Sequence, residues 1–185
     1  IFGWEMPASM TQFFNPFFII VFGSIFSVMW VKLAKIGKNP SIPMKFSFGI
    51  IQLALGFLVT QVGFQFVSES FQVPLLTLVF VYLLHTTGEL FLSPIGLSMV
   101  TKLSPKKMAG TAMGAWFLSF AIANYVGGKI AAITGGHGGD EALSVEAGLD
   151  NYLSVFSTIG FVLIGIAILI AVLNNPIKKL MHGVE

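Results

Sequence analysis

The sequence predicts an all-α integral membrane protein with five transmembrane helices. Of its 185 residues, 55% are hydrophobic and only 10% are charged, and the mean hydropathy is +0.87. A soluble domain carries roughly a quarter charged residues, so this composition is too apolar for a protein surrounded by water. Five apolar segments are long enough to cross a hydrocarbon core as helices, which takes about 20 residues each.

These five segments form one predicted unit, residues 1–185, which we interpret as a partial C-terminal helical bundle. They cover approximately residues 10–31, 46–66, 75–100, 108–132 and 152–173. Turn or helix-breaking residues such as Pro40, Pro74 and Pro105 lie between them. The sequence does not begin with Met. Five is also an awkward number of helices for a complete transporter built of repeats. We therefore expect the chain to be a fragment of a longer protein.

The lysines predict the direction of the chain across the membrane. There is no arginine, and nine of the ten lysines follow the first, third and fifth segments, while Lys129 alone belongs to the other side. Cytoplasmic loops of membrane proteins are enriched in basic residues. The N-terminus is therefore predicted to lie outside and the C-terminus in the cytoplasm.

Several classes of function are excluded or disfavoured. The chain has no cysteine and therefore no disulfide or thiolate metal site, and its net charge of +2 is too small to indicate a nucleic-acid partner. His137, Asp140 and Glu141 lie among four glycines, which indicates a solvated loop rather than a metal site. No catalytic triad, P-loop or zinc motif is present, so we expect neither an enzyme nor a cofactor.

Glu89 is the acidic residue inside a predicted span, near the middle of the third. A charge at the bilayer centre costs about 2.5–3.5 kcal/mol on insertion scales, so such a residue indicates a functional site. Helical spacing predicts that His85, Glu89 and Ser93 share one polar face. Glu89 could pair with a basic residue on another helix, or bind substrate or a proton. His85 could be a proton relay or a neutral side chain bonded to a neighbouring helix.

Three further residues are candidates for the same cavity. Asn15 precedes Pro16, where proline is expected to bend the helix, and the amide could contact a ligand or satisfy the freed backbone. The fourth segment begins with small residues that favour close helix packing. Within that segment Trp116 could fill a pocket or pack in the core, and Asn124 could line the same cavity.

Three stretches together resemble a known family. "PASMTQFFNPFFII", "YLLHTTGELFLSPIGLSMVTKLSP" and "GTAMGAWFLSFAIANYVGG" are similar, in this order, to the C-terminal half of bacterial proton-coupled oligopeptide transporters. That family belongs to the major facilitator superfamily, and the resemblance covers nearly the whole chain. It implies that the five segments correspond to helices eight to twelve of such a transporter.

The resemblance also implies roles for individual residues. Glu89 and Asn15 resemble the glutamate and asparagine that receive the amino terminus of the peptide, and Ser93 resembles a serine facing the cavity. Trp116 resembles a tryptophan lining a side-chain pocket. At the cytoplasmic side, the inner gate would include Leu97 and Met113.

The implied function is proton-coupled symport of di- and tripeptides across the bacterial inner membrane. This chain would supply one wall of the peptide cavity, and its partners would be peptides, protons, lipid and the N-terminal half of the same transporter. That half would carry the basic partner of Glu89. Two alternatives stay open: a carrier of another small solute such as an anion, or a structural or assembly subunit of the membrane.

Overall fold

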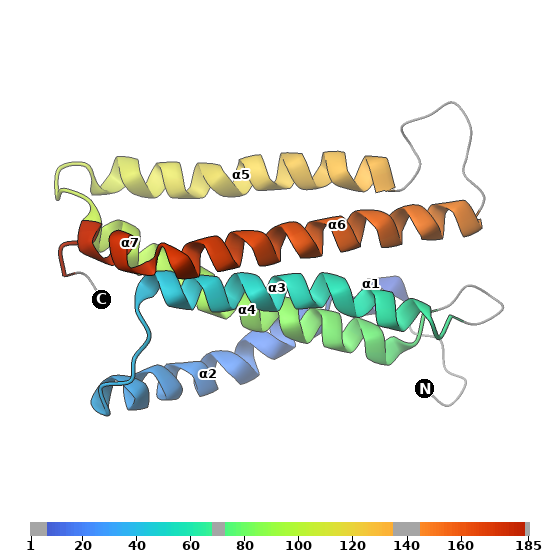
Figure 1. Cartoon of the computed structure of the whole chain (residues 1–185), viewed down its shortest axis with the longest axis horizontal. Coiled ribbons are helices and arrows are strands. Elements are labelled where there is room, and N and C mark those ends of the chain that lie inside the picture. The colour runs from blue at the N-terminus through green and yellow to red at the C-terminus, as the bar shows by residue number, and fades with distance from the viewer. Residues whose placement is uncertain (1–6, 68–72, 135–144, 184–185) are drawn as a thin grey trace.

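The computed structural model describes residues 7–67, 73–134 and 145–183, and the regular structure in these ranges is helical throughout (Figure 1). The helices are α1 (Ala8–Thr11), α2 (Phe14–Lys35), α3 (Ile42–Phe64), α4 (Leu75–Leu103), α5 (Ala109–Thr134), α6 (Val145–Val172) and α7 (Asn174–Leu180). The predicted all-α class is therefore confirmed.

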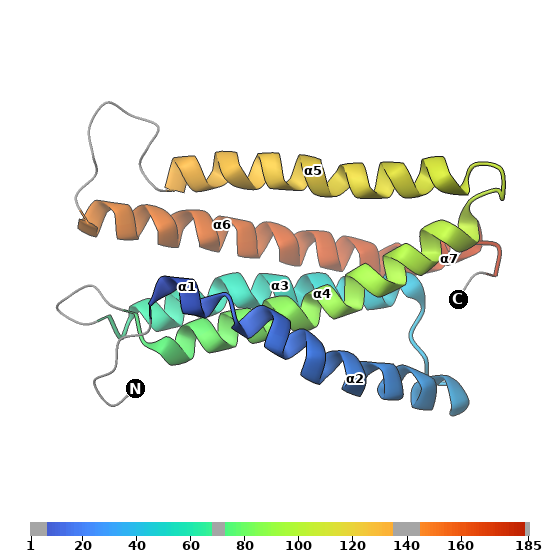
Figure 2. The same ribbon diagram turned by 180° about the vertical axis from the view of Figure 1, so that it is seen from behind.

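The five long helices run side by side and alternate in direction along the chain, so α2, α4 and α6 run one way and α3 and α5 run the other (Figures 1 and 2). Four of them are long and apolar enough to cross a membrane: Phe14–Lys35, Ile42–Phe64, Leu75–Leu103 and Ala147–Val172. The chain is thus a multi-pass membrane protein. Helix α5 forms where a fifth span was predicted, and it is rich in Gly and Ala.

Helix α3 is the centre of the bundle and packs against both α4 and α6. Its buried positions are mostly small, including Ser47, Gly49, Ala54 and Gly56. A Cβ atom built on Gly49 would lie 2.9 Å from the carbonyl oxygen of Gly88, and one on Gly88 would lie 2.8 Å from that of Gly49. These two glycines therefore let the backbones of α3 and α4 touch, as small residues do in membrane helix pairs.

Hydrogen bonds between helices fasten α3 to α6. The Ser47 hydroxyl donates to the Ala167 carbonyl at 2.8 Å, and the Gln61 amide donates to the Leu153 carbonyl at 2.7 Å. In a membrane such bonds satisfy polar groups that have no water available. Together with the glycine contact to α4, they make α3 the framework on which the other helices are placed.

One end of the bundle, which we call the lysine-rich end, gathers nine of the ten lysines. It comprises the C-terminal ends of α2, α4 and α6, the N-terminal ends of α3 and α5, and α7 (left in Figure 1). Lys129 lies in the last turns of α5, toward the opposite end. The segregation agrees with the sequence pattern, while the direction of this end relative to the membrane stays a prediction.

Three helix starts differ from the sequence prediction, and that of α6, at Val145 rather than near Tyr152, differs most. Helix α2 begins at Phe14 rather than near Met10, because the short α1 and a turn precede it. Pro16 therefore lies in the first turn, where its missing N–H has no partner within the helix anyway, and not at a bend inside the span. Helix α3 begins at Ile42, four residues earlier than predicted, with Pro43 in its first turn.

Candidate functional site

A cluster of three polar side chains joins α2 to α4. The Asn15 amide nitrogen Nδ2 donates to the Thr86 hydroxyl at 3.2 Å and to Glu89 Oε2 at 3.5 Å. Thr86 is completely buried, Asn15 is half-buried and the Glu89 side chain is exposed. The structure therefore brings together the two residues predicted to receive an amino terminus, and adds a third.

Glu89 lies at the centre of its helix. Fourteen residues of α4 precede it (75–88) and fourteen follow it (90–103), in a helix of 29 residues. At about 1.5 Å per residue, Glu89 is some 20 Å from either end of α4. A carboxylate so placed lies near the middle of the hydrocarbon layer, where it needs a compensating partner or a wet cavity.

Aromatic contacts hold α2 against α4 on both sides of this cluster. The ring centroids of Phe14 and Tyr82 are 5.9 Å apart, and Phe91 makes edge-on contacts with Phe26 at 5.2 Å and Trp30 at 5.1 Å. Edge-to-face aromatic pairs are worth about 0.5–1.5 kcal/mol beyond the area they bury. They fix the spacing of α2 and α4, and so the distance between Asn15 and Glu89.

The helix around Glu89 carries a second polar feature. Pro94 lies inside α4 and has no N–H, so the carbonyl of Leu90, four residues earlier, loses its helical partner. That carbonyl belongs to the residue next to Glu89. Ser93, partly exposed, lies one turn after Glu89 on the same helix. This stretch of α4 can therefore present a carboxylate, a free carbonyl and a hydroxyl.

The predicted grouping of His85 with Glu89 is not observed. The His85 ring packs against α3, where it would overlap a Cβ atom on Gly56 and where the Phe57 ring centroid is 4.8 Å away. Its Nε2 has no hydrogen-bond partner among the described residues. Successive positions four apart turn by about 40° around a helix, so His85 reaches α3 while Glu89 reaches α2.

Trp116 on α5 packs onto α4 through Gly96. A Cβ atom on Gly96 would overlap the Trp116 ring and would lie 3.2 Å from Phe46. The ring lines a groove of about 580 Å³ with Met99, Val100, Leu103, Ser104, Pro105, Ala112, Ala115 and Ser119. Gly96 is seven residues, or about 10 Å, from Glu89 toward the lysine-rich end.

The other predicted residues, Leu97, Met113 and Asn124, lie on α4 and α5. Leu97 of α4 is exposed and Met113 of α5 is partly exposed, both toward the lysine-rich end, and the structure shows no direct link between them and the Asn15–Glu89 pair. Asn124 is exposed on α5, and its Nδ2 donates to the Phe120 carbonyl of the same helix at 2.8 Å. Its part in the cavity stays a prediction.

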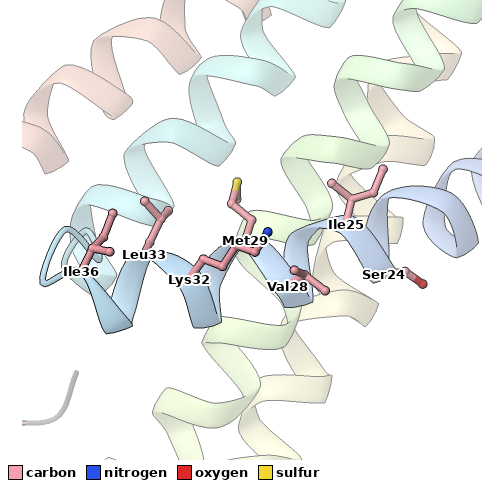
Figure 3. A pocket seen from close by; sticks show the side chains of 7 residues that line it. All are labelled: Ser24, Ile25, Val28, Met29, Lys32, Leu33 and Ile36. Atoms are coloured by element: carbon pink, nitrogen blue, oxygen red, sulfur yellow. The ribbon is translucent and has the colours of Figure 1, made fainter.

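A second groove, of about 610 Å³, lies along α2 and does not include these polar residues. It is lined by Ser24, Ile25, Val28, Met29, Lys32, Leu33 and Ile36 (Figure 3). Its lining is almost entirely apolar, with Lys32 at the lysine-rich end. It contains no acidic group that could receive a cation, so it is a poor candidate for the same chemistry.

No group of three His, Cys, Asp or Glu side chains that could hold a metal is found in the described ranges. His137, Asp140 and Glu141, the loop cluster noted in the sequence, lie outside the described residues.

The arrangement is suited to binding a cation rather than an anion. A carboxylate accepts hydrogen bonds only, and the Asn15 side chain adds a carbonyl acceptor once its nitrogen is occupied. Thr86 was not singled out from the sequence, because threonine is common in membrane helices. Its spacing three residues before Glu89 is the signal that places it on the same side of α4.

Comparison with known proteins gives a consistent result. The sequence profile of the POT family (PTR2) matches residues 1–140. The chain is 35% identical over 182 residues to the transporter YclF of Bacillus subtilis, and 34% identical over 183 residues to the dipeptide and tripeptide permease B of Xenorhabdus bovienii. In each case 98% of this chain is covered.

The fold also matches a solved structure. A variant of a peptide transporter POT, crystallised in complex with alafosfalin, superposes with a TM-score of 0.82 at 32% identity, covering 99% of this chain and 34% of that one. The chain likewise spans only 34% and 37% of the two relatives above. Nearly the whole of this chain thus matches about a third of each full-length protein. Since the family profile also covers residues 1–140, this chain belongs to the POT family.

Proposed function

We propose that this chain is part of a proton-coupled symporter of di- and tripeptides, in which it supplies one wall of the peptide cavity. The relatives are about three times as long, so the activity is proposed for a complete transporter that contains these helices. The other wall would come from an N-terminal half. Protons would be the coupling ion, with no cofactor and no enzymatic step.

The observation that carries the proposal is the Asn15–Glu89 pair at the middle of α4. A peptide amino terminus is a primary ammonium with three hydrogen-bond donors, which a carboxylate and an amide carbonyl can accept. At 3.5 Å the bond between Asn15 and Glu89 is long. It leaves the carboxylate free to take an ammonium, a lysine from the other half, or a proton.

The remaining predicted residues take roles around this pair. Ser93 would face the cavity one turn below Glu89, and Trp116, seated on Gly96, would line a pocket for peptide side chains. The groove beside Trp116 supports this role. Leu97 and Met113 would belong to the inner gate, and Asn124 to the cavity wall. We place the lysine-rich end in the cytoplasm of a bacterial inner membrane, following the bias of basic residues.

His85 is the weakest of the proposed positions. Its ring packs against Gly56 and Phe57 of α3, which fits a packing role better than a proton relay.

The experiment is uptake of labelled dialanine into liposomes that contain the complete transporter, with and without an inward proton gradient. We expect uptake to require the gradient and to collapse in Glu89→Gln, which keeps the size of the side chain and removes its charge. Gradient-driven uptake that is unchanged in Glu89→Gln would remove Glu89 from the site. Absence of peptide uptake by folded protein would reopen the choice of substrate.

A further inference from the structure

Thr86 is a buried hydroxyl group with an unusual partner. It is 0% exposed, and its oxygen accepts a hydrogen bond from Asn15 on another helix. A threonine inside a helix commonly donates to a carbonyl of its own preceding turn. The neighbouring Thr87 does so, with the Leu83 carbonyl at 2.7 Å and the Leu84 carbonyl at 3.2 Å. Thr86 instead spans the gap from α4 to α2.

The chemistry of the cluster fixes how the Asn15 amide is turned. An ionised carboxylate has no donor, so the NH₂ group of Asn15 must face Glu89. The same NH₂ group bonds Thr86, so both of its hydrogens are used within the cluster. The amide oxygen Oδ1 takes no part in these two bonds and is left as an acceptor.

The two bonds of Asn15 differ in how permanent they are. Glu89 is exposed and exchanges partners in the proposed function, while Thr86 is buried and stays within the bundle. When Glu89 takes a proton or an ammonium, its bond to Asn15 weakens. The Thr86 hydroxyl then holds the amide in place.

We propose that Thr86 is a positioning residue for the subsite that binds the amino terminus of the peptide. It anchors Asn15 so that its carbonyl oxygen and the Glu89 carboxylate face the same ammonium group. The inference rests on the proposed function, since it needs Glu89 and Asn15 to bind the peptide. Thr86 itself touches no substrate.

The test compares Thr86→Val, which keeps the shape and removes the hydroxyl, with Thr86→Ser, which keeps the hydroxyl. Thr87→Val is the matched control, because Thr87 is the adjacent, buried threonine whose hydroxyl bonds only its own helix. Uptake of dialanine by the complete transporter gives KM and the maximal rate per folded molecule. We expect Thr86→Val to raise KM roughly 3- to 10-fold, as for one lost hydrogen bond, with the maximal rate within about twofold. Thr86→Ser should restore KM, and Thr87→Val should behave like the wild type.

A double-mutant cycle separates positioning from a general structural role. If Thr86 acts through Asn15, then Thr86→Val should change KM by less than about twofold in an Asn15→Ala background. Equal effects in both backgrounds, or an equal rise of KM in Thr87→Val, would overturn the inference. If Thr86→Val does not fold, Thr86→Cys takes its place with the same expectations.

The outcomes also distinguish a failure of the role of Thr86 from a failure of the proposed function. A transporter that needs Glu89 for peptide uptake but ignores Thr86→Val keeps the proposed function and refutes the role of Thr86. A transporter that takes up dialanine equally well in Glu89→Gln refutes both.

Discussion

At the scale of single residues, Glu89 holds a charge where charge is costly, and within the described part of the chain its side chain has one long hydrogen bond to support it. The cost of a carboxylate at the bilayer centre is about 2.5–3.5 kcal/mol on insertion scales. One neutral amide at 3.5 Å offsets only part of that cost. The side chain therefore gains from any cation or proton that reaches it, and the exchange of such partners is the basis of coupling in the proposed function.

Removing the amide of Asn15 should weaken peptide binding. We expect Asn15→Ala to raise the KM for dialanine roughly 10-fold, since hydrogen bonds to charged groups are worth about 1.5–3 kcal/mol and part is replaced by water. Ser24→Ala is the control on the same helix, because that exposed hydroxyl bonds only the Ile20 carbonyl. An unchanged KM in Asn15→Ala would show that α2 does not contribute to the subsite.

Gly96 should influence which peptides are accepted. A methyl group at Gly96 overlaps the Trp116 ring, so Gly96→Ala must push the indole off α4. We expect the preference between dialanine and a dipeptide with a large aromatic side chain to change by roughly 3-fold or more in competition assays. Gly114→Ala on α5 adds its methyl group to open space and should leave the preference as it is. Equal preferences in both variants would show that the position of Trp116 does not influence peptide selectivity.

At the scale of helices, the crossing of α3 and α4 depends on two glycines whose backbones touch. Neither backbone can move aside as a flexible side chain would, so a methyl group at this crossing must separate the helices. Helix α3 also carries the contacts to α6, so a displaced α3 affects most of the bundle.

We expect Gly49→Ala to lower the free energy of unfolding by about 1–3 kcal/mol, the usual range for overpacking. Gly165→Ala on α6, with nothing within 4 Å of the added Cβ, should be neutral or stabilise by up to about 1 kcal/mol through helix propensity. Thermal and denaturant unfolding in detergent would measure both. Equal stabilities of the two variants would contradict the close crossing of α3 and α4.

The sequence predicted the helices better than their contacts. Runs of apolar residues indicate spans because the bilayer requires a helix of known length. Each predicted segment overlaps a helix of the structure. Helix starts shifted because proline and turn residues, not hydropathy, decide where the first turn forms. The packing of His85 on α3 depends on the space left by Gly56, which is 29 positions away in the chain. The periodicity of a single helix cannot predict that contact.

At the scale of the whole molecule, the bundle separates its charges along its length. Nine lysines lie at one end, where the alternation of helix directions brings together three separate stretches of sequence. This end is predicted to face the cytoplasm. The Asn15–Glu89 pair lies between the two ends, within the apolar middle.

Labelling of single cysteines tests this orientation directly, since the chain has no cysteine of its own. In right-side-out membranes, we expect a thiol reagent that cannot cross the bilayer to label Lys129→Cys but to reach Lys106→Cys only after the membrane is opened. Both side chains are exposed on this chain. The reverse pattern would invert the predicted direction of the chain.

The site was partly predictable for a physical reason. Glu89 and Asn15 stood out because polar side chains are rare and costly within spans. Their pairing across 74 residues of sequence, and the presence of Thr86 beside them, depend on how α2 packs on α4, which the aromatic contacts decide. A single sequence contains no direct signal of that packing.

The most direct test of the role of Glu89 is to compare binding of dialanine with binding of N-acetyl-dialanine, which lacks the ammonium group. Affinities would be measured on the complete transporter, as the wild type and as Glu89→Gln. We expect the wild type to prefer free dialanine by about 10-fold or more, and Glu89→Gln to reduce that preference to about twofold. An equal preference in both proteins would contradict the assignment of Glu89 as the receptor of the peptide amino terminus.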